Sequence, residues 1–422
     1  MQIRQGVNLN IIKTNKFKTV RFTVRFRAPL SIKTVSKRVI ISNLWETSNE
    51  VYRTNRDFDL KLSSMYGANF ATSVRKKGRD HFLSLNLNIV DPDLLGDENL
   101  LEEAIDFIKA VIFKPLLDQE VRQSFDAATF SREQKNLVRY LESTVEDKAY
   151  YASQKLNDLY FQDEDMRLSS ISNAELLQQE NSIDTYSYYQ EMLAKEAIDI
   201  VIVGDVDENK VYDLFKNLPF KEREPEKTSI FYEQKNMALK KQEEIKDANQ
   251  SVLNMAYNLP ISYGTKLYPA LQVFNGLFGG FPHSKLFLNV REREGLAYYA
   301  SSSFDSFAGL VRVKSGIDAV NKDKVIDLIS EQLESLRKGD FSDEDLAQTK
   351  RMLTNAYKLA QDSVGNLLEQ KLLEDLLGKR YMVEESWLQA VNKVTKSDVM
   401  QVANCINLNA IYFLKGESHG ED

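Results

Sequence analysis

The order of expected helices and strands recurs in the two halves of the chain. In the first half a helix precedes the apolar strand 197–205, and in the second half a helix precedes the apolar strand 410–414. Earlier in each half, apolar residues at helical spacing indicate an amphipathic helix, first over 101–113 and then over 323–337. A repeat of about 210 residues in a chain of 422 predicts two copies of one domain, each with its own core.

Several other segments alternate apolar and polar residues. The runs 19–26 (TVRFTVRF) and 82–89 (FLSLNLNI) are typical of antiparallel strands with one buried face. We therefore expect an α+β fold of two duplicated domains, each a mostly antiparallel sheet with helices packed on one face. Further strands are expected at 7–13, 251–259 and 308–316, and further helices at 34–52, 55–66, 118–142, 145–161, 184–194, 265–277, 343–361, 364–378 and 395–404.

A highly charged segment separates the two halves. Residues 221–250 are rich in Lys and Glu and poor in large apolar residues. A solvated connector explains such a charge run better than a binding arm does. The sequence therefore predicts an N-terminal α+β domain over 1–220, a charged connector over 221–250, and a C-terminal α+β domain over 251–422.

Histidine is scarce in this chain. There are three, His81, His283 and His419, and they lie far apart in the sequence. A structural zinc site needs closely spaced Cys and His ligands, and a catalytic zinc helix needs two histidines one turn apart. Neither arrangement can form from a local segment here, which argues against zinc hydrolysis by this chain alone.

Other common functional classes also lack sequence support. There is no G-x-S-x-G elbow, no phosphate-binding glycine loop and no C-x-x-C pair. A formal net charge of −7 argues against a nucleic-acid partner, and no apolar run is long enough for a membrane span. Because no signal-peptide pattern is present and Cys405 has no cysteine with which to pair, we expect a cytoplasmic location.

The most informative stretch of the sequence is 279–298, GGFPHSKLFLNVREREGLAY. The two glycines and Pro282 predict a turn that enters a helix. Leu286, Phe287 and Val290 would form the buried stripe of that helix, and Gly295 is placed to end it. This segment resembles the second-domain motif of the pitrilysin/insulinase family of zinc metallopeptidases, in which a glycine-rich loop leads into a helix of the type SRLFxxVREKxGLAY.

The resemblance extends over essentially the whole chain, although only this stretch matches at the level of a motif. The family includes the mitochondrial processing peptidase, and its members have two duplicated domains of about this size. The resemblance therefore implies a fold of the LuxS/MPP-like metallopeptidase type. It also implies a bacterial relative of the non-catalytic kind, because the metal motif of the family is missing.

The family carries H-x-x-E-H on a helix of the first domain. The matching window here is 39–43, Val-Ile-Ile-Ser-Asn, which has neither histidine nor glutamate, and no histidine precedes His81. Glu133 falls near the place of the distal glutamate ligand, but a single carboxylate would hold zinc weakly, so a helix-surface position explains it better. We therefore expect no metal ligands in this chain and zinc only on a partner subunit.

The resemblance assigns two candidate catalytic residues. Arg291 and Tyr298 match the family's Arg/Tyr pair, which grips the peptide carbonyl and the tetrahedral intermediate opposite the zinc. A guanidinium supplies fixed donors, and a phenol can bond a developing oxyanion. The alternative is that Arg291 is a structural ion-pair partner and that Tyr298 only begins a strand.

The resemblance also suggests residues that bind the peptide. The strand containing Phe70, Ala71, Thr72 and Ser73 matches the family's edge strand, which pairs with extended substrate through backbone hydrogen bonds. Candidates in the glycine-rich loop are Gly279, Gly280 and His283. An exposed, solvated loop position is the simpler explanation for His283, as a structural role is for His81.

Two functions from different classes follow. The first is a non-catalytic subunit of a heterodimeric zinc peptidase, which supplies chamber wall, peptide-binding strand and Arg/Tyr pair to a paralogous partner bearing H-x-x-E-H. The second is a stand-alone (homodimeric) scaffold that binds peptides or proteins without hydrolysis. A weaker third possibility is a metal site assembled from distant residues such as His81 and Glu133.

Overall fold

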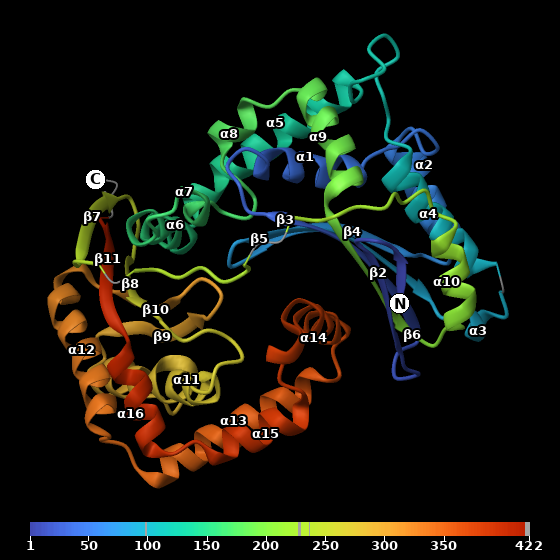
Figure 1. Ribbon diagram of the computed structural model, residues 1–422. Helices are drawn as coiled ribbons and strands as arrows, with labels where there is room; N and C mark the ends of the chain where they lie inside the picture. The colour runs from blue at the N-terminus through green and yellow to red at the C-terminus, as the bar shows by residue number, and fades with distance from the viewer. Residues whose placement is uncertain (98, 227–228, 236, 418–422) are drawn as a thin grey trace. The chain divides into compact units, whose positions relative to one another are not determined.

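The computed structural model describes residues 1–97, 99–226, 229–235 and 237–417 (Figure 1). The chain divides into two compact units. The N-terminal unit consists of Met1–Ser143 and Leu168–Ser229, and the C-terminal unit consists of Thr144–Arg167 and the chain from Ile230 onward. In the described residues, no helix is long and apolar enough to cross a membrane.

The N-terminal unit is built on a six-stranded sheet of order β1-β2-β6-β3-β5-β4. Only β2 and β6 run parallel, and the other neighbours are antiparallel. Strand β4 pairs with β5 alone and therefore forms one edge of the sheet. Its strands are β1 (Gln2–Arg4), β2 (Val7–Lys13), β3 (Thr19–Pro29), β4 (Asn69–Lys77), β5 (Asp80–Val90) and β6 (Ala197–Gly204).

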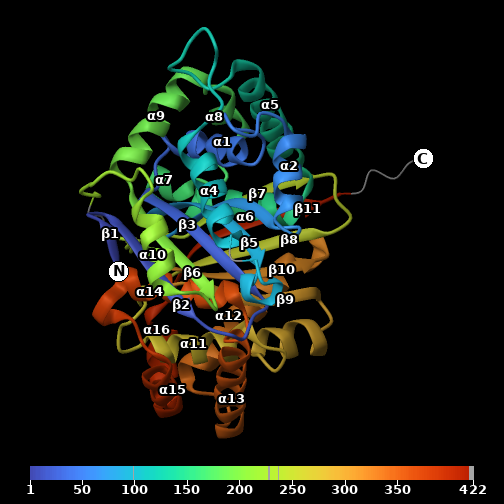
Figure 2. The same ribbon diagram turned by 90° about the vertical axis from the view of Figure 1, so that its right-hand side faces the viewer.

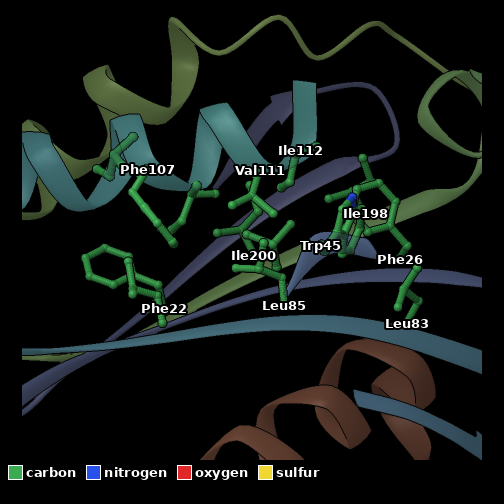
Figure 3. Packing of buried hydrophobic residues seen from close by; sticks show 14 of the residues in the cluster. Phe22, Phe26, Trp45, Leu83, Leu85, Phe107, Val111, Ile112, Ile198 and Ile200 are labelled. Atoms are coloured by element: carbon green, nitrogen blue, oxygen red, sulfur yellow. The ribbon is translucent and has the colours of Figure 1, made fainter. Parts of the chain in front are cut away.

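Helices cover one face of this sheet, as Figures 1 and 2 show. The alternation in β3 explains which face, because Phe22 and Phe26 point into the core while Arg21 lies on the opposite face. The helices are α1 (Val35–Trp45), α2 (Asn55–Ser64), α3 (Pro92–Leu95), α4 (Leu100–Phe113), α5 (Ala127–Ser143), α8 (Ala174–Gln178), α9 (Ser182–Lys195) and α10 (Glu208–Lys216). Figure 3 shows the core residues packed together, among them Phe22, Phe26, Trp45, Leu85, Phe107, Val111 and Ile200.

The C-terminal unit has a five-stranded sheet of order β7-β11-β8-β10-β9. In chain order this is first, last, second, fourth and third strand, which is also the order of β2-β6-β3-β5-β4 in the N-terminal unit. The first and last strands of these two sets of five, β2 with β6 and β7 with β11, run parallel. The expected duplicated α+β fold is thus confirmed. The strands are β7 (Lys240–Lys246), β8 (Ser251–Asn258), β9 (Ala297–Asp305), β10 (Leu310–Ile317) and β11 (Asn407–Gly416).

The helices of the C-terminal unit include two segments of π-helix in the glycine-rich region. These are η2 (Gly276–Gly280), which continues α11 (Tyr268–Asn275), and η3 (Leu286–Arg293). The others are α6 (Lys148–Tyr160), α7 (Glu164–Arg167), α12 (Lys322–Lys338), α13 (Asp343–Ala360), α14 (Val364–Leu377), α15 (Glu384–Lys393) and α16 (Lys396–Cys405), with short 3₁₀ turns η1 (Thr144–Glu146), η4 (Ala319–Asn321) and η5 (Gly378–Arg380).

Two elements differ from what the sequence led us to expect. Part of the charged segment forms strand β7, whose side chains are mostly exposed, so that pairing with β11 holds it at the sheet edge without an apolar pattern. Helix α6 comes from the first half of the sequence but packs on β8 and β11. This packing accounts for the place of 144–167 in the C-terminal unit, and Tyr151 of the helix adds a 2.9 Å hydrogen bond to Glu244 of β7.

A buried arginine holds helix α1 against the N-terminal sheet. Arg38 has no exposed surface, and it forms an ion pair with Glu196 at the end of α9. Its guanidinium also donates to the Phe26 carbonyl of β3 at 2.9 Å and to His81 Nδ1 of β5 at 2.8 Å. Burial acts to lower the pKa of Arg38, but the adjacent Glu196 and Tyr188 outweigh it, so the net shift is upward and the charge is retained.

We predict that Glu196→Gln destabilises the chain by about 3–5 kcal/mol, because Arg38 would remain buried without a counter-charge. Urea unfolding followed by circular dichroism measures the change. Glu191→Gln is the matched control, since the Glu191–Lys195 pair is exposed and should contribute under about 0.5 kcal/mol. Equal stability of the two variants would contradict the prediction.

Candidate functional site

The segment expected to carry a zinc motif lies on α1, between β3 and β4. In the C-terminal unit the same place in the strand order, between β8 and β9, is taken by α11, η2 and η3. The two motif regions of the sequence therefore occupy equivalent positions in the duplicated fold. Each lies beside the edge strand of its own sheet, β4 or β9.

The residues of the window 39–43 do not fit zinc. Val39 is buried in the apolar core, and the Asn43 side chain donates to the Val39 carbonyl within the same helix at 3.0 Å. Ser42 donates to Thr72 Oγ1 at 2.8 Å. None of these is a usual zinc ligand. Within the described part of the chain, no three His, Cys, Asp or Glu side chains are grouped so that they could hold a metal ion.

Glu133 is not on the helix surface, contrary to our expectation. It lies on α5 with only 9% of its surface exposed, and the adjacent Arg132 donates to its carboxylate at 2.7 Å. Burial follows from the packing of α5 against α1 and α8. The carboxylate is therefore matched by a cation of its own chain.

His81 is buried and has partners at both ring nitrogens. Nδ1 accepts from Arg38, and Nε2 lies 2.9 Å from the Ser170 carbonyl. Burial, and then the charge of Arg38, lower the pKa of His81 from 6.5 to about 3. The expected structural role of His81 fits this environment, and the ring has no free nitrogen for a metal.

Phe70, Ala71, Thr72 and Ser73 all lie on β4, the edge strand. Ala71 is exposed, while the Phe70 ring packs against Phe107 with centroids 5.3 Å apart. Thr72 is bound by α1: its backbone N–H and its hydroxyl both donate to Glu46 Oε1, the hydroxyl at 2.7 Å. One outward-facing donor of the edge is therefore occupied by a side chain of the same unit.

The glycines of the C-terminal motif are required by close packing. A Cβ on Gly279 would overlap the backbone nitrogen of Ser302 in β9, and a Cβ on Gly280 would lie 2.7 Å from Asn275 Nδ2. Gly279 is buried and Gly280 exposed. Gly295, with φ of +61°, follows η3 as the sequence predicts.

His283 is half-buried rather than solvated. Thr349 donates its hydroxyl to the Asp345 carbonyl at 2.8 Å, so the 2.7 Å contact between Thr349 and His283 has Nε2–H as donor. The ring also stacks on Phe281. Burial lowers the pKa of His283 and outweighs Asp345, whose charge acts to raise it. The net shift favours the neutral ring.

Arg291 and Tyr298 are both exposed. Arg291 lies over the Phe287 ring at 4.6 Å and is 3.7 Å from its neighbour Glu292, a pair whose two side chains are 41% and 54% exposed. Tyr298 is the second residue of β9, is 62% exposed, and donates to Asp318 at 3.3 Å. Strand β9 packs against η3, so the two residues belong to adjacent elements of one unit.

Sequence reasoning missed Arg38, Glu46 and Glu196. Arg38 directly follows Lys37 and precedes the apolar residues 39–41, so nothing in the sequence distinguishes it from an exposed charge. Glu46 follows Ser42 by one helical turn and thus shares its face, but nothing in the sequence shows that Thr72 lies opposite.

Comparisons with known proteins agree on one family. Residues 183–353 match the family described as Peptidase M16 inactive domain. A Bacillus subtilis protein named probable inactive metalloprotease YmfF is 32% identical over 414 residues, covering 97% of this chain and 96% of the relative. The crystal structure of a conserved protein from Enterococcus faecalis is 44% identical, with a TM-score of 0.94 over 100% of this chain and 99% of the other.

A more distant structure shares the fold. The peptidase M16 inactive domain protein from Pseudomonas fluorescens superposes with a TM-score of 0.79 at 15% identity, covering 99% of this chain and 98% of the other. The likeness of fold therefore covers nearly the whole chain.

We predict that the isolated chain takes up far less than one equivalent of zinc in equilibrium dialysis at pH 7, because neither α1 nor the His81 region provides a ligand set. His81→Ala should leave that weak uptake unchanged. Stoichiometric binding that His81→Ala abolishes would contradict the assignment of His81 to the core.

His81 also predicts a pH dependence of stability. In the unfolded chain this histidine takes up a proton near pH 6.5, whereas the folded chain resists protonation to about pH 3. Stability is therefore lost as the pH falls below 6.5. From pH 7 to pH 5 the contribution of His81 to the free energy of unfolding should fall by about 2 kcal/mol.

Urea unfolding at the two pH values, compared between wild type and His81→Gln, measures this loss, because the other titrating groups are common to both chains. The variant should lose less stability than wild type. Identical losses would mean that His81 titrates normally in the folded state.

Proposed function

The chain belongs to the M16 family of peptidases, the pitrilysin/insulinase family, and from this premise we propose that it is the non-catalytic subunit of a two-protein zinc peptidase. The zinc is held by a paralogous partner that carries H-x-x-E-H. This chain supplies chamber wall, an edge strand for the peptide, and the Arg291/Tyr298 pair.

The exposure of Arg291 and Tyr298 is the observation that carries the proposal. A structural ion pair would be buried or strongly bonded, whereas the Arg291–Glu292 contact joins adjacent exposed residues and contributes little to stability. Tyr298 leaves more than half of its surface exposed and makes one long hydrogen bond. The fold therefore has little need of either side chain, and both are available to a ligand.

The chemistry of the two side chains fits this role. The Arg291 guanidinium donates hydrogen bonds to a peptide carbonyl, and the Tyr298 phenol donates to the oxyanion that develops when water attacks it. When bound to the partner, zinc supplies the activated water. This chain contributes charge stabilisation and orientation of the peptide.

The peptide itself is held by main-chain pairing with the outer edge of β4. An edge strand with exposed backbone groups binds extended peptides with little dependence on their side chains. The half-buried Phe70 and the exposed Ala71 border that edge. His283 and the loop around Gly280 are the peptide-binding residues that we propose for the C-terminal unit.

Affinity capture of the tagged chain from its native cell tests the pairing. We expect a similar-sized protein bearing H-x-x-E-H, about one zinc per pair, and hydrolysis of unstructured peptides. Recovery of the chain alone, metal-free and as a monomer or homodimer, would contradict the proposal and favour the stand-alone peptide- or protein-binding scaffold.

For the pair, Arg291→Ala and Tyr298→Phe should each lower kcat by about a hundredfold, because each removes a donor to the oxyanion. The melting temperature of the chain should not change, since both residues are exposed. Arg293→Ala is the matched control, an exposed arginine on the same π-helix, and should retain activity. Full activity of both site variants would remove the pair from the mechanism.

A further inference from the structure

At the contact between α1 and β4, the Glu46 side chain lies over part of the outer edge of β4. Thr72 lies opposite Leu85 in the antiparallel pair of β4 and β5. Its N–H points to Glu46 instead of to β5, so the backbone groups of Thr72 face the outer edge. By the same alternation, the N–H and C=O groups of Phe70 and Val74 also face outward. These are the groups that a pairing peptide would use.

Glu46 occupies the centre of that row. Its Oε1 accepts both the N–H and the hydroxyl of Thr72, so the carboxylate takes the place that a carbonyl of an added strand would take. A bond to an ionised acceptor is stronger than a bond to a neutral peptide carbonyl. A peptide cannot pair with Thr72 while Glu46 remains there.

Helix α1 does not depend on this bond. Arg38 fixes the helix to the sheet, and one further hydrogen bond joins the helix to β4, because the Ser42 hydroxyl donates to Thr72 Oγ1 at 2.8 Å. Glu46 follows the last residue of α1 and is exposed, so its side chain can rotate into solvent at little cost to packing. An unprotected edge strand invites aggregation, which explains why an unoccupied edge would be covered.

We propose that Glu46 is a built-in competitor for the peptide-binding edge of β4, so that capture of an extended peptide requires release of the Glu46 carboxylate from Thr72. This inference rests on the proposed peptide-binding role of β4 and adds its regulation. The covered edge is the resting state, and the peptide-bound edge is the state in which Glu46 faces solvent.

Fluorescence anisotropy with the full chain tests the proposal. The probe is a labelled, uncharged, extended peptide of about ten residues rich in threonine and valine. Its counterpart carries an N-methyl group at every residue and so lacks the main-chain donors on both of its edges. Glu46→Ala should lower the Kd of the first peptide by about fivefold to tenfold. This is the effect expected when the peptide no longer has to break the charge-assisted hydrogen bond between Thr72 and Glu46.

Two further variants act as controls. Glu46→Gln should have an intermediate effect, because its amide oxygen is a neutral acceptor. Glu50→Ala removes the same charge from another exposed residue nearby and should bind like wild type. Amide hydrogen exchange of the segment containing Thr72 should be faster in Glu46→Ala than in wild type. Measured without peptide, this difference reports the loss of the bond between the Thr72 N–H and Glu46.

The outcomes separate the two claims. If Glu46→Ala binds the first peptide more tightly than wild type and does not bind the N-methylated peptide, the result supports Glu46 as a competitor for the edge. Equal or weaker binding by Glu46→Ala, with binding still lost on N-methylation, overturns the competitor but leaves β4 as the peptide site. No binding by any variant, or equal binding of both peptides, overturns the peptide-binding role of β4 and the competitor with it.

Discussion

The N-terminal unit depends on one buried cation. Arg38 joins helix α1 to β3, to β5 and, through Glu196, to the end of α9. The core tolerates this charge because the Glu196 carboxylate, the Phe26 carbonyl and the His81 ring nitrogen all accept from the guanidinium. His81 must stay neutral to accept from Arg38, so the histidine nearest the expected metal helix serves the core. The same contacts set the position of α1 beside the edge strand.

The two copies of the domain use the same place in the strand order differently. In the N-terminal unit α1 contacts its edge strand through Ser42, Glu46 and Thr72, so polar side chains fill the gap. In the C-terminal unit η2 contacts β9 at Gly279 with no side chain between the backbones. The π-helical turns lower the regularity of this segment, as is frequent at functional sites. One copy therefore holds a covered edge, and the other presents exposed polar side chains.

Much of the fold could be predicted from the sequence because the relevant forces are local or repeated. Alternation in 19–26 and 82–89 identified two central strands, and the recurrence of helices and strands identified the duplication. Strand β7 could not be predicted, since its seven mostly charged residues are held by pairing with a strand some 170 residues later. Helix α6 was predicted, but the sheet on which it packs was not. Periodicity shows which face of a helix is buried and does not show which element covers that face. The buried position of Glu133 was missed for the same reason.

Loss of metal ligands leaves this fold intact for a physical reason. Where a structural metal joins helices and strands, its removal unfolds the domain, because the free energy of metal binding is part of what stabilises the folded state. Here α1 is held by Arg38, by packing of Val39 and Trp45, and by hydrogen bonds to β4. The helix can therefore lack zinc ligands without a cost in stability. Arg291 and Tyr298 differ from Arg38, since they are exposed and contribute little to the stability of the fold. Stability alone accounts for Arg38, whereas in our proposal the exposed pair serves a ligand and not the core of the C-terminal unit.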